Sequence, residues 1–145
     1  MKDLVELTVR ECLDLLHGGI VGRVAVSTAL GPRIVPVNYA MYDDAIVFRT
    51  SPYSELGSLA RGSEAAFEID HIDYDRHQGW SVVALGRLEA VPADELEDVR
   101  KVWEPRPWAG GVRNLYLKLT WREISGRRLG HDWTRSTMMP VRRVL

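Results

Sequence analysis

The chain has 145 residues, of which 46% are hydrophobic and 27% are charged. A chain of this length is expected to form one domain that buries about two thirds of its unfolded surface, so it can fold without disulfides or metal ions. The composition excludes a disordered chain and a fibre.

The net charge of −1 hides an uneven distribution of charge along the chain. Up to Trp121 there are 13 Lys and Arg against 18 Asp and Glu, whereas residues 122–145 carry 6 against 2. The six arginines form no continuous basic run, so a solvated or subunit-facing tail explains them better than a nucleic-acid site does. We expect no nucleic acid as a partner.

Cys12 is the only cysteine, which excludes an internal disulfide and fits a reducing compartment. The first residues lack a basic region followed by an apolar stretch and a cleavage site. No segment reaches the ~18 apolar residues that a membrane span needs. A cytoplasmic protein with no membrane partner is expected.

The first expected element is a short helix. Thr8 and Glu11 have the spacing of a capping box, and the apolar stripe that follows stops at Gly18 and Gly19. Three strands are predicted after it, at residues 21–28, 33–42 and 45–50. The turn signals Gly31-Pro32 and Asp43-Asp44 separate these strands, which indicates an antiparallel meander.

The second of these strands alternates between two faces. Ile34, Pro36 and Asn38 belong to one set, and Val35 and Val37 belong to the other. Pro36 cannot donate a backbone hydrogen bond, so its backbone is expected at an edge, at a bulge or beside something other than a strand. A ligand is one such neighbour.

The rest of the chain predicts a short helix, two strands, a second helix and a final strand. Their expected ranges are 53–61, 64–73, 80–91, 93–104 and 115–124. Six strands in antiparallel order are more stable closed than open, because closure removes exposed sheet edges. We therefore predict a mainly β fold, a β-barrel with short helices, in residues 1–129. Residues 130–145 form a basic tail.

A phosphate site is indicated between the third strand and the short helix. A helix that begins near Ser54 would offer unpaired backbone N–H groups, and Arg49 would supply a guanidinium that matches phosphate oxygens. The alternative is that Ser54 only caps the helix and Arg49 is an exposed strand residue.

Other chemistry has weaker support. His71, Asp73, Asp75 and His77 would share one face of an extended segment, but a solvated turn explains this polar cluster better than a metal site. No strained serine turn, dinucleotide-binding glycine motif or phosphate-binding loop of ATPases is present, so hydrolysis and ATP use are not expected.

Six motifs together resemble the FMN-binding split barrel superfamily, which includes pyridoxamine 5'-phosphate oxidase and small flavin or deazaflavin reductases. The resemblance covers residues 7–129. In chain order the motifs are RIVPVNY (33–39), IVFRTSPYSEL (46–56), AAFEID (65–70), GWSVVALGRLEAV (79–91), PWAGG (107–111) and EISGRRL (123–129).

The resemblance implies a six-stranded antiparallel split barrel that forms a homodimer with FMN at the interface. The backbone from Ile34 to Asn38 would pass along the flavin ring, Arg49 and Thr50 would contact the phosphate, and Ser54 would add a hydroxyl. Ser81 would form a hydrogen bond with the flavin, and the PWAGG loop would cover the substrate side of the ring. The full set of candidate cofactor residues is Arg33, Ile34, Val35, Pro36, Val37, Asn38, Arg49, Thr50, Ser54, Glu55 and Ser81.

Glu55 departs from the pattern of the superfamily, which commonly has Lys or Arg at this position. Two like charges about 4 Å apart repel by on the order of 4 kcal/mol at an effective dielectric constant near 20. Glu55 facing a phosphate directly would therefore weaken binding strongly. If it points to solvent instead, Arg33, Arg61 or an arginine of a partner subunit would supply the missing positive charge.

The resemblance implies an FMN-dependent oxidoreductase that transfers hydride between a reduced nicotinamide and a small substrate, with no side chain acting as nucleophile. Pyridoxamine 5'-phosphate oxidation itself is less expected, because the chain after Leu129 lacks that enzyme's terminal motif. The alternatives are a reductase that uses the deazaflavin F420, a haem-binding member of the fold, and a non-enzymatic dimer that has lost flavin binding through Glu55.

Overall fold

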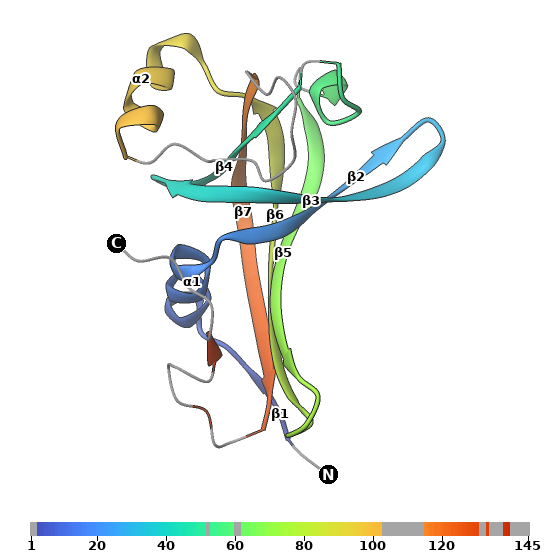
Figure 1. Cartoon of the computed structure of the whole chain (residues 1–145), viewed down its shortest axis with the longest axis vertical. Coiled ribbons are helices and arrows are strands. Elements are labelled where there is room, and N and C mark those ends of the chain that lie inside the picture. The colour runs from blue at the N-terminus through green and yellow to red at the C-terminus, as the bar shows by residue number, and fades with distance from the viewer. Residues whose placement is uncertain are drawn as a thin grey trace.

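The structure, a computed structural model, describes residues 3–51, 53–59, 62–102, 115–130, 133, 138 and 139. Seven strands, two α-helices and one 3-10 turn make up these residues (Figure 1). They are β1 (Leu4–Glu6), α1 (Val9–Gly18), β2 (Val21–Thr28), β3 (Gly31–Tyr42), β4 (Ala45–Thr50), η1 (Gly57–Leu59), β5 (Ser63–Asp73), β6 (Gln78–Ala90), α2 (Ala93–Val102) and β7 (Leu115–Leu129). No helix among them is long and apolar enough to cross a membrane.

The sheet is antiparallel and closes on itself. Its order is β1-β7-β4-β3-β2-β5-β6, and β6 also pairs with β7, so the strands from β2 to β7 form a closed ring. The expectation of a mainly β, antiparallel barrel with short helices is confirmed. The seventh strand, β1, was not predicted, because three residues are too few to show an alternation.

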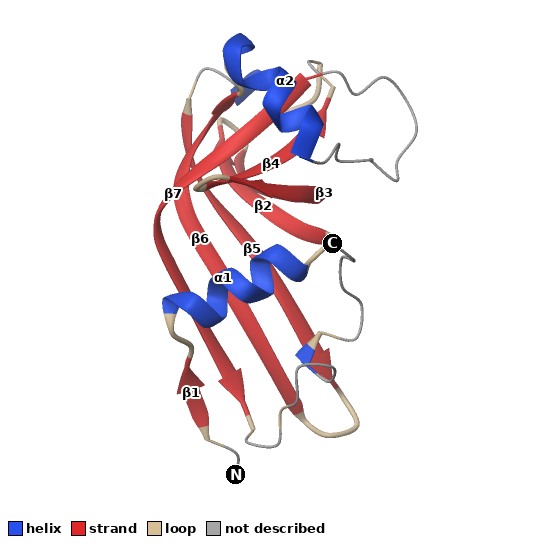
Figure 2. Cartoon of the chain, turned by 90° about the vertical axis from the view of Figure 1, so that its left-hand side faces the viewer, coloured by secondary structure: helices blue, strands red, loops and turns tan. Residues whose placement is uncertain are grey.

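The barrel is split because β7 is long enough to pair with two strands in succession along one of its edges. Its first part, from Leu115 to Thr120, pairs with β4, and its last part, from Arg127 to Leu129, pairs with β1. Between these regions β5, β6 and β7 continue as a sheet that α1 crosses (Figure 2). Thr8 caps α1 with the predicted capping box to Glu11.

Most apolar side chains of the strands point into one core. Tyr39 and Phe67 are fully buried at its centre with ring centroids 4.8 Å apart, and the Tyr39 hydroxyl donates to the Leu16 carbonyl of α1 at 2.6 Å. A second, smaller cluster lies outside the barrel wall, where α2 covers β3, β4 and β7. Its buried members are Ala40, Val47, Val91, Val99 and Tyr116.

A β-bulge between β6 and β7 shifts the register by one residue. Leu85 pairs with Glu123 and Gly86 with Trp121, which leaves Arg122 as the extra residue. Inward-facing residues of β7 therefore have odd numbers before the bulge and even numbers after it. The predicted strand ended at 124, five residues early, because the apolar alternation changes phase here.

The segment after β4 differs from its prediction. A helix was expected over residues 53–61, but the described part contains only the one-turn η1. The Ser54 hydroxyl accepts from Gly57 N at 3.0 Å and donates to the Ser51 carbonyl at 2.7 Å. The bond from Gly57 N is that of a helix N-cap, and Ser58 N donates to the Ser54 carbonyl at 3.1 Å, as in a helical turn. Ser54 therefore caps a turn as expected, but the described residues form only a short turn in place of the predicted helix.

Part of the predicted C-terminal tail packs against the barrel. Met139 belongs to the main core, and the Trp80 indole N–H donates to the Met138 carbonyl. Trp133 donates to the Leu129 carbonyl at 3.0 Å. That residues 1–129 form the whole domain stays a prediction.

Substituting Gly86 should destabilise the closure of the barrel. A Cβ at this position would lie 2.0 Å from the Thr120 carbonyl oxygen, which is backbone and cannot rotate away. We expect Gly86→Ala to lower the free energy of unfolding by at least about 2 kcal/mol, measured by urea denaturation. In the control Gly79→Ala, on the same strand, the nearest atom is 3.2 Å away, and the loss should be under about 1 kcal/mol. Equal losses for the two variants would contradict this account of the bulge.

Candidate functional site

The candidate residues of β3 divide between the two faces of the barrel wall. Val35 and Val37 face inward and pack against the core. Ile34, Pro36 and Asn38 face outward, where Ile34 is 71% exposed and Pro36 is also exposed. This is the alternation that the sequence predicted. The outward three form an open strip along β3 that is mainly apolar.

The strip continues across β4 onto β7. Tyr39 pairs with Phe48, so Asn38 and Arg49 are the adjacent residues on these two strands and face outward together. Arg49 pairs in turn with Tyr116 of β7. The Arg49 guanidinium carbon lies 5.3 Å from the centroid of the Tyr116 ring, within the range of a cation–π interaction. We call the residues Ile34, Pro36, Asn38 and Arg49 the outer strip.

Thr50 and Ser54 form a separate pair at the end of β4. Thr50 follows Arg49 in an extended strand, so its side chain projects to the opposite side of the sheet. The Thr50 hydroxyl lies 2.8 Å from the Ser54 hydroxyl, and Thr50 is buried. The predicted phosphate site of Arg49, Thr50 and Ser54 is therefore divided: Arg49 lies on the outer side of β4, whereas Thr50 and Ser54 lie on the other side, at the end of the strand.

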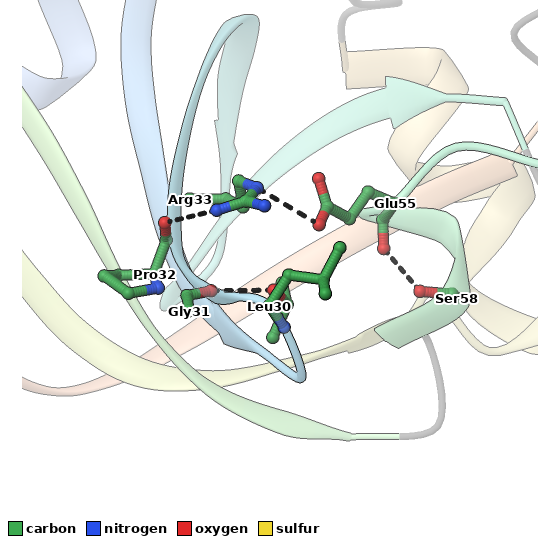
Figure 3. Close-up of polar contacts among 7 residues, drawn as sticks. Leu30, Gly31, Pro32, Arg33, Glu55 and Ser58 are labelled. Carbon is green, nitrogen blue, oxygen red and sulfur yellow. Dashed lines mark hydrogen bonds and ion pairs between the residues drawn. The ribbon is translucent and has the colours of Figure 1, made fainter.

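Arg33 contacts Glu55, the residue that departs from the superfamily pattern. The Arg33 Nε lies 3.6 Å from Glu55 Oε1, and Figure 3 shows the two side chains pointing toward each other. Arg33 also donates to the Pro32 carbonyl at 3.2 Å, and the Ser58 hydroxyl donates to the Glu55 carbonyl at 2.6 Å. Arg33, one of the three positive charges expected here, thus balances the Glu55 carboxylate.

Ser81 lies on the outward side of β6, distant from the outer strip. It pairs with Asp70 of β5, and β2 lies between β5 and β3. Three strand spacings separate β6 from β3, which is about 14 Å. The structure therefore places Ser81 on the same face as the strip and does not bring the two together.

A charged cluster that the sequence did not reveal lies beside the strip. Arg23 of β2 pairs with Pro36 on one side and with Glu68 on the other. Its guanidinium donates to Glu68 Oε1 from Nε at 2.9 Å and contacts Asp70 Oδ2 at 3.2 Å. Burial, and then the hydrogen bond with Asp70, raise the pKa of Glu68, while Arg23 opposes the shift. The strand register brings these three residues together, and the register cannot be read from the sequence.

Several other candidate residues are not brought to the outer strip by the described structure. Arg61 and the PWAGG loop lie outside the described residues. His71 and Asp73 end β5, whereas Asp75 and His77 lie in the turn to β6. Among the residues that the structure describes, no three His, Cys, Asp or Glu side chains are arranged to hold a metal ion.

The outer strip suits a flat ligand with an anionic end. Ile34 and Pro36 offer exposed apolar surface to a ring, whereas Asn38 and Arg49 offer N–H donors to phosphate oxygens. Thr50 and Ser54 add hydroxyls at the end of β4. The Glu55 carboxylate is held by Arg33, so the one negative charge among the candidate residues is compensated. The donor set therefore fits a phosphorylated aromatic cofactor.

The closed antiparallel barrel, continued at one end as an open sheet, defines the split-barrel fold class. A family profile described as pyridoxamine 5'-phosphate oxidase matches residues 8–128. The match covers most of the chain, and the protein belongs to this family.

Three individual proteins are among those similar to this chain. Rv0080, an uncharacterized protein of Mycobacterium tuberculosis, is 29% identical over 136 residues, which are 90% of this chain and 89% of Rv0080. The FAD binding protein from Mycobacterium smegmatis is 26% identical, with a TM-score of 0.71 over 86% of this chain and 98% of its own. A conserved protein of unknown function from Corynebacterium diphtheriae is 27% identical, with a TM-score of 0.69 over 87% and 98%.

The Arg33 and Glu55 pair should contribute little to stability. The two side chains are 39% and 43% exposed, and exposed ion pairs are worth about 0 to 1 kcal/mol. We expect a double-mutant cycle with Arg33→Gln and Glu55→Gln, followed by urea denaturation, to give a coupling below about 1 kcal/mol. A coupling of several kcal/mol would mean that the pair is buried when the protein is in solution.

Removing the Asp70 charge should lower the pKa of Glu68. The raised pKa means that the folded protein binds a proton at Glu68 more readily than the unfolded chain does. The contribution of Glu68 to stability therefore falls as pH rises above about 4.3, the ordinary pKa of Glu. In Asp70→Asn the loss of stability with rising pH should be smaller. Carbon-detected NMR titration of Glu68 would measure its pKa, and denaturation at several pH values would measure the stability. An unchanged titration curve would exclude Asp70 as a cause.

Proposed function

We propose that this protein binds a flavin nucleotide on the outer strip. The ring lies along β3 from Ile34 to Asn38, and the phosphate lies at the Arg49 end, beside Thr50 and Ser54. The observation that carries the proposal is the continuity of exposed apolar surface with the guanidinium of Arg49 across one strand pair. The similarity to the FAD binding protein from Mycobacterium smegmatis supports it. FMN is the smallest flavin that would use every part of the strip.

The bound flavin would supply the redox chemistry, accepting hydride from a reduced nicotinamide and passing it to a small substrate. The chain itself would supply three things. The backbone of Ile34 to Asn38 would set the plane of the ring, Arg49 would fix the phosphate, and Arg33 would keep the Glu55 carboxylate from repelling it. No nucleophilic side chain is required, so we assign no catalytic residue.

A homodimer with the cofactor between the two copies belongs to the same proposal. A ring on the outer strip would have the barrel wall on one side only. Ile34, at 71% exposure, and Leu30, at 82%, leave apolar surface that a second copy would cover. Covering this face would also exclude water from the ring. Light scattering of the purified protein should therefore give about twice the chain mass of 16.4 kDa. A monomer at micromolar concentration would contradict the dimer.

The decisive experiment is the absorbance spectrum of the purified protein, followed by titration with FMN, FAD and F420. We expect a flavin band or binding of a flavin nucleotide at micromolar concentration. Binding of F420 alone would replace the flavin with the deazaflavin alternative. Failure of all three to bind at tens of micromolar would leave the non-enzymatic interpretation of the fold. Oxidation of NADH or NADPH by the flavin-loaded protein would then test the oxidoreductase.

Substituting Arg49 should weaken flavin binding, because it removes a charge-assisted hydrogen bond to the flavin phosphate. We expect Arg49→Gln to raise the dissociation constant of FMN by at least about tenfold, measured by quenching of flavin fluorescence. The affinity for riboflavin, which lacks the phosphate, should fall much less in this variant. The control Arg76→Gln changes an exposed arginine in the turn between β5 and β6 and should leave both affinities unchanged. Equal losses for FMN and riboflavin would mean that Arg49 does not hold the phosphate.

A further inference from the structure

The strand β3 is longer than the strand that pairs with it on one side. Residues from Gly31 to Asn38 pair with β2, whereas β4 pairs only with residues from Tyr39 to Tyr42. In the part of the chain that the structure describes, β2 and β4 are the only strands beside β3. The hairpin of β2 and β3 extends away from the barrel here (Figure 1), and we call the β3 edge that faces away from β2 in residues 31–37 the open edge. An exposed strand edge of this length is a template for pairing with another chain.

The hydrogen-bond pattern shows which backbone groups point to the open edge. Tyr39 N donates to the carbonyl of Ile20, the residue before β2, at 3.0 Å. Backbone groups of successive residues in an antiparallel strand point alternately to its two sides. Odd-numbered residues of β3 therefore bond to β2, and even-numbered residues present their backbone groups to the other side. On the open edge these residues are Pro32, Ile34 and Pro36.

Both prolines of β3 thus lie at positions that face the open edge. A proline has no N–H, so it would remove a hydrogen bond of the ladder if it faced β2, and at positions 32 and 36 it removes none. Ile34 is the one residue of the three that can donate from its backbone. A strand that approached from this side would meet that single donor, whereas each of the three positions donates in an edge without proline.

Charged side chains lie at the same edge near the turn. The Pro32 carbonyl accepts a hydrogen bond from Arg33 at 3.2 Å, and Arg33 contacts Glu55 (Figure 3). An approaching strand would have to bury these charges, which costs free energy. The hairpin nevertheless carries exposed apolar surface, since Ile34 is 71% exposed and Leu30 is 82% exposed.

We propose that Pro32 and Pro36 prevent a second copy of this chain from pairing with the open edge of β3. An exposed edge with apolar side chains favours edge-to-edge association, and a proline that faces the edge opposes it. Here the two prolines remove donors from the open edge and leave the pairing of β2 with β3 intact. The surface beside the outer strip therefore stays accessible without becoming a site of self-association. The inference does not depend on a flavin, and it concerns a different contact from the proposed dimer, which would cover the outer strip.

The alternative role of the prolines is to restrict the unfolded chain and so to stabilise β3. In that case, replacing them would lower the stability of the protein but would not change the association of the folded protein. Association of folded variants is therefore the quantity that separates the two roles.

The experiment replaces the prolines with β-branched residues, in Pro32→Thr, in Pro36→Val and in the double variant. Light scattering and thioflavin T fluorescence over a range of protein concentrations measure association relative to the wild type, whether the wild type is a monomer or the proposed dimer. We expect the double variant to assemble at a concentration at least about tenfold lower than the wild type, because pairing gains two backbone hydrogen bonds. Each single variant should lie between them. Hydrogen exchange of the Ile34 amide should be slower in the assemblies than in the dispersed protein.

A matched pair of substitutions tests the assignment of the open edge itself. Ile34→Pro removes a donor from the open edge, so its urea midpoint should stay close to that of Ile34→Ala. Val35→Pro removes a bond to β2, so its midpoint should fall well below that of Val35→Ala. A larger loss for proline at 34 than at 35 would show that the edge is assigned wrongly.

Urea denaturation and circular dichroism identify which proline variants are folded. Folded variants that associate no more than the wild type would overturn the proposal. Association that occurs only in variants that have lost the fold would also overturn it, because the contact would then not be made by the folded edge. If the double variant does not fold, the two single variants decide between these outcomes.

Discussion

The hydrogen-bond ladder of β7 is the constraint on which the rest of the structure depends. One edge of this strand pairs with β6 from Leu117 to Leu129, and the other edge pairs first with β4 and then with β1. The strand so closes the barrel at one end and extends an open sheet at the other. The closed part of the barrel has no exposed strand edges, and α2 covers only the small apolar cluster on its outer wall. The lower half is open and needs α1 across its face. The division into a closed part and a covered part is a direct consequence of the length of one strand.

Closure also determines what the outer surface can do. In a barrel whose interior is filled, each strand has only its outward residues available for a ligand. The outer strip arises because β3 alternates valines inward with Ile34, Pro36 and Asn38 outward. The wall behind the strip is held rigid by the Tyr39 and Phe67 rings and by the bond of Tyr39 to α1. Binding residues on a rigid wall need little ordering when a ligand arrives, which favours affinity.

Much of the fold could be predicted because it rests on local patterns. Strands β2 and β4 have the predicted limits, and the capping box of Thr8 is present. Ser54 caps a helical turn as its position predicted, but the described residues after it form only the short η1, so the length of the predicted helix was wrong. The anomalous charge of Glu55 was visible in the sequence, but its contact with Arg33 depends on how two distant segments fold together. The clusters around Tyr116 and Arg23 depend on strand register, which periodicity alone does not give.

The bulge opposite Gly86 gives a single residue control over the chemistry of the outer surface. Arg122 is the extra residue, and the strand before it has the opposite facing to the strand after it. Tyr116 and Lys118 face outward under α2 only because of this change of phase, while Leu117 and Leu119 fill the core. In this barrel a one-residue insertion or deletion in β7 is therefore not a neutral change of length. Relatives that differ in length here would be expected to differ in what they bind, even where every residue of β3 is the same.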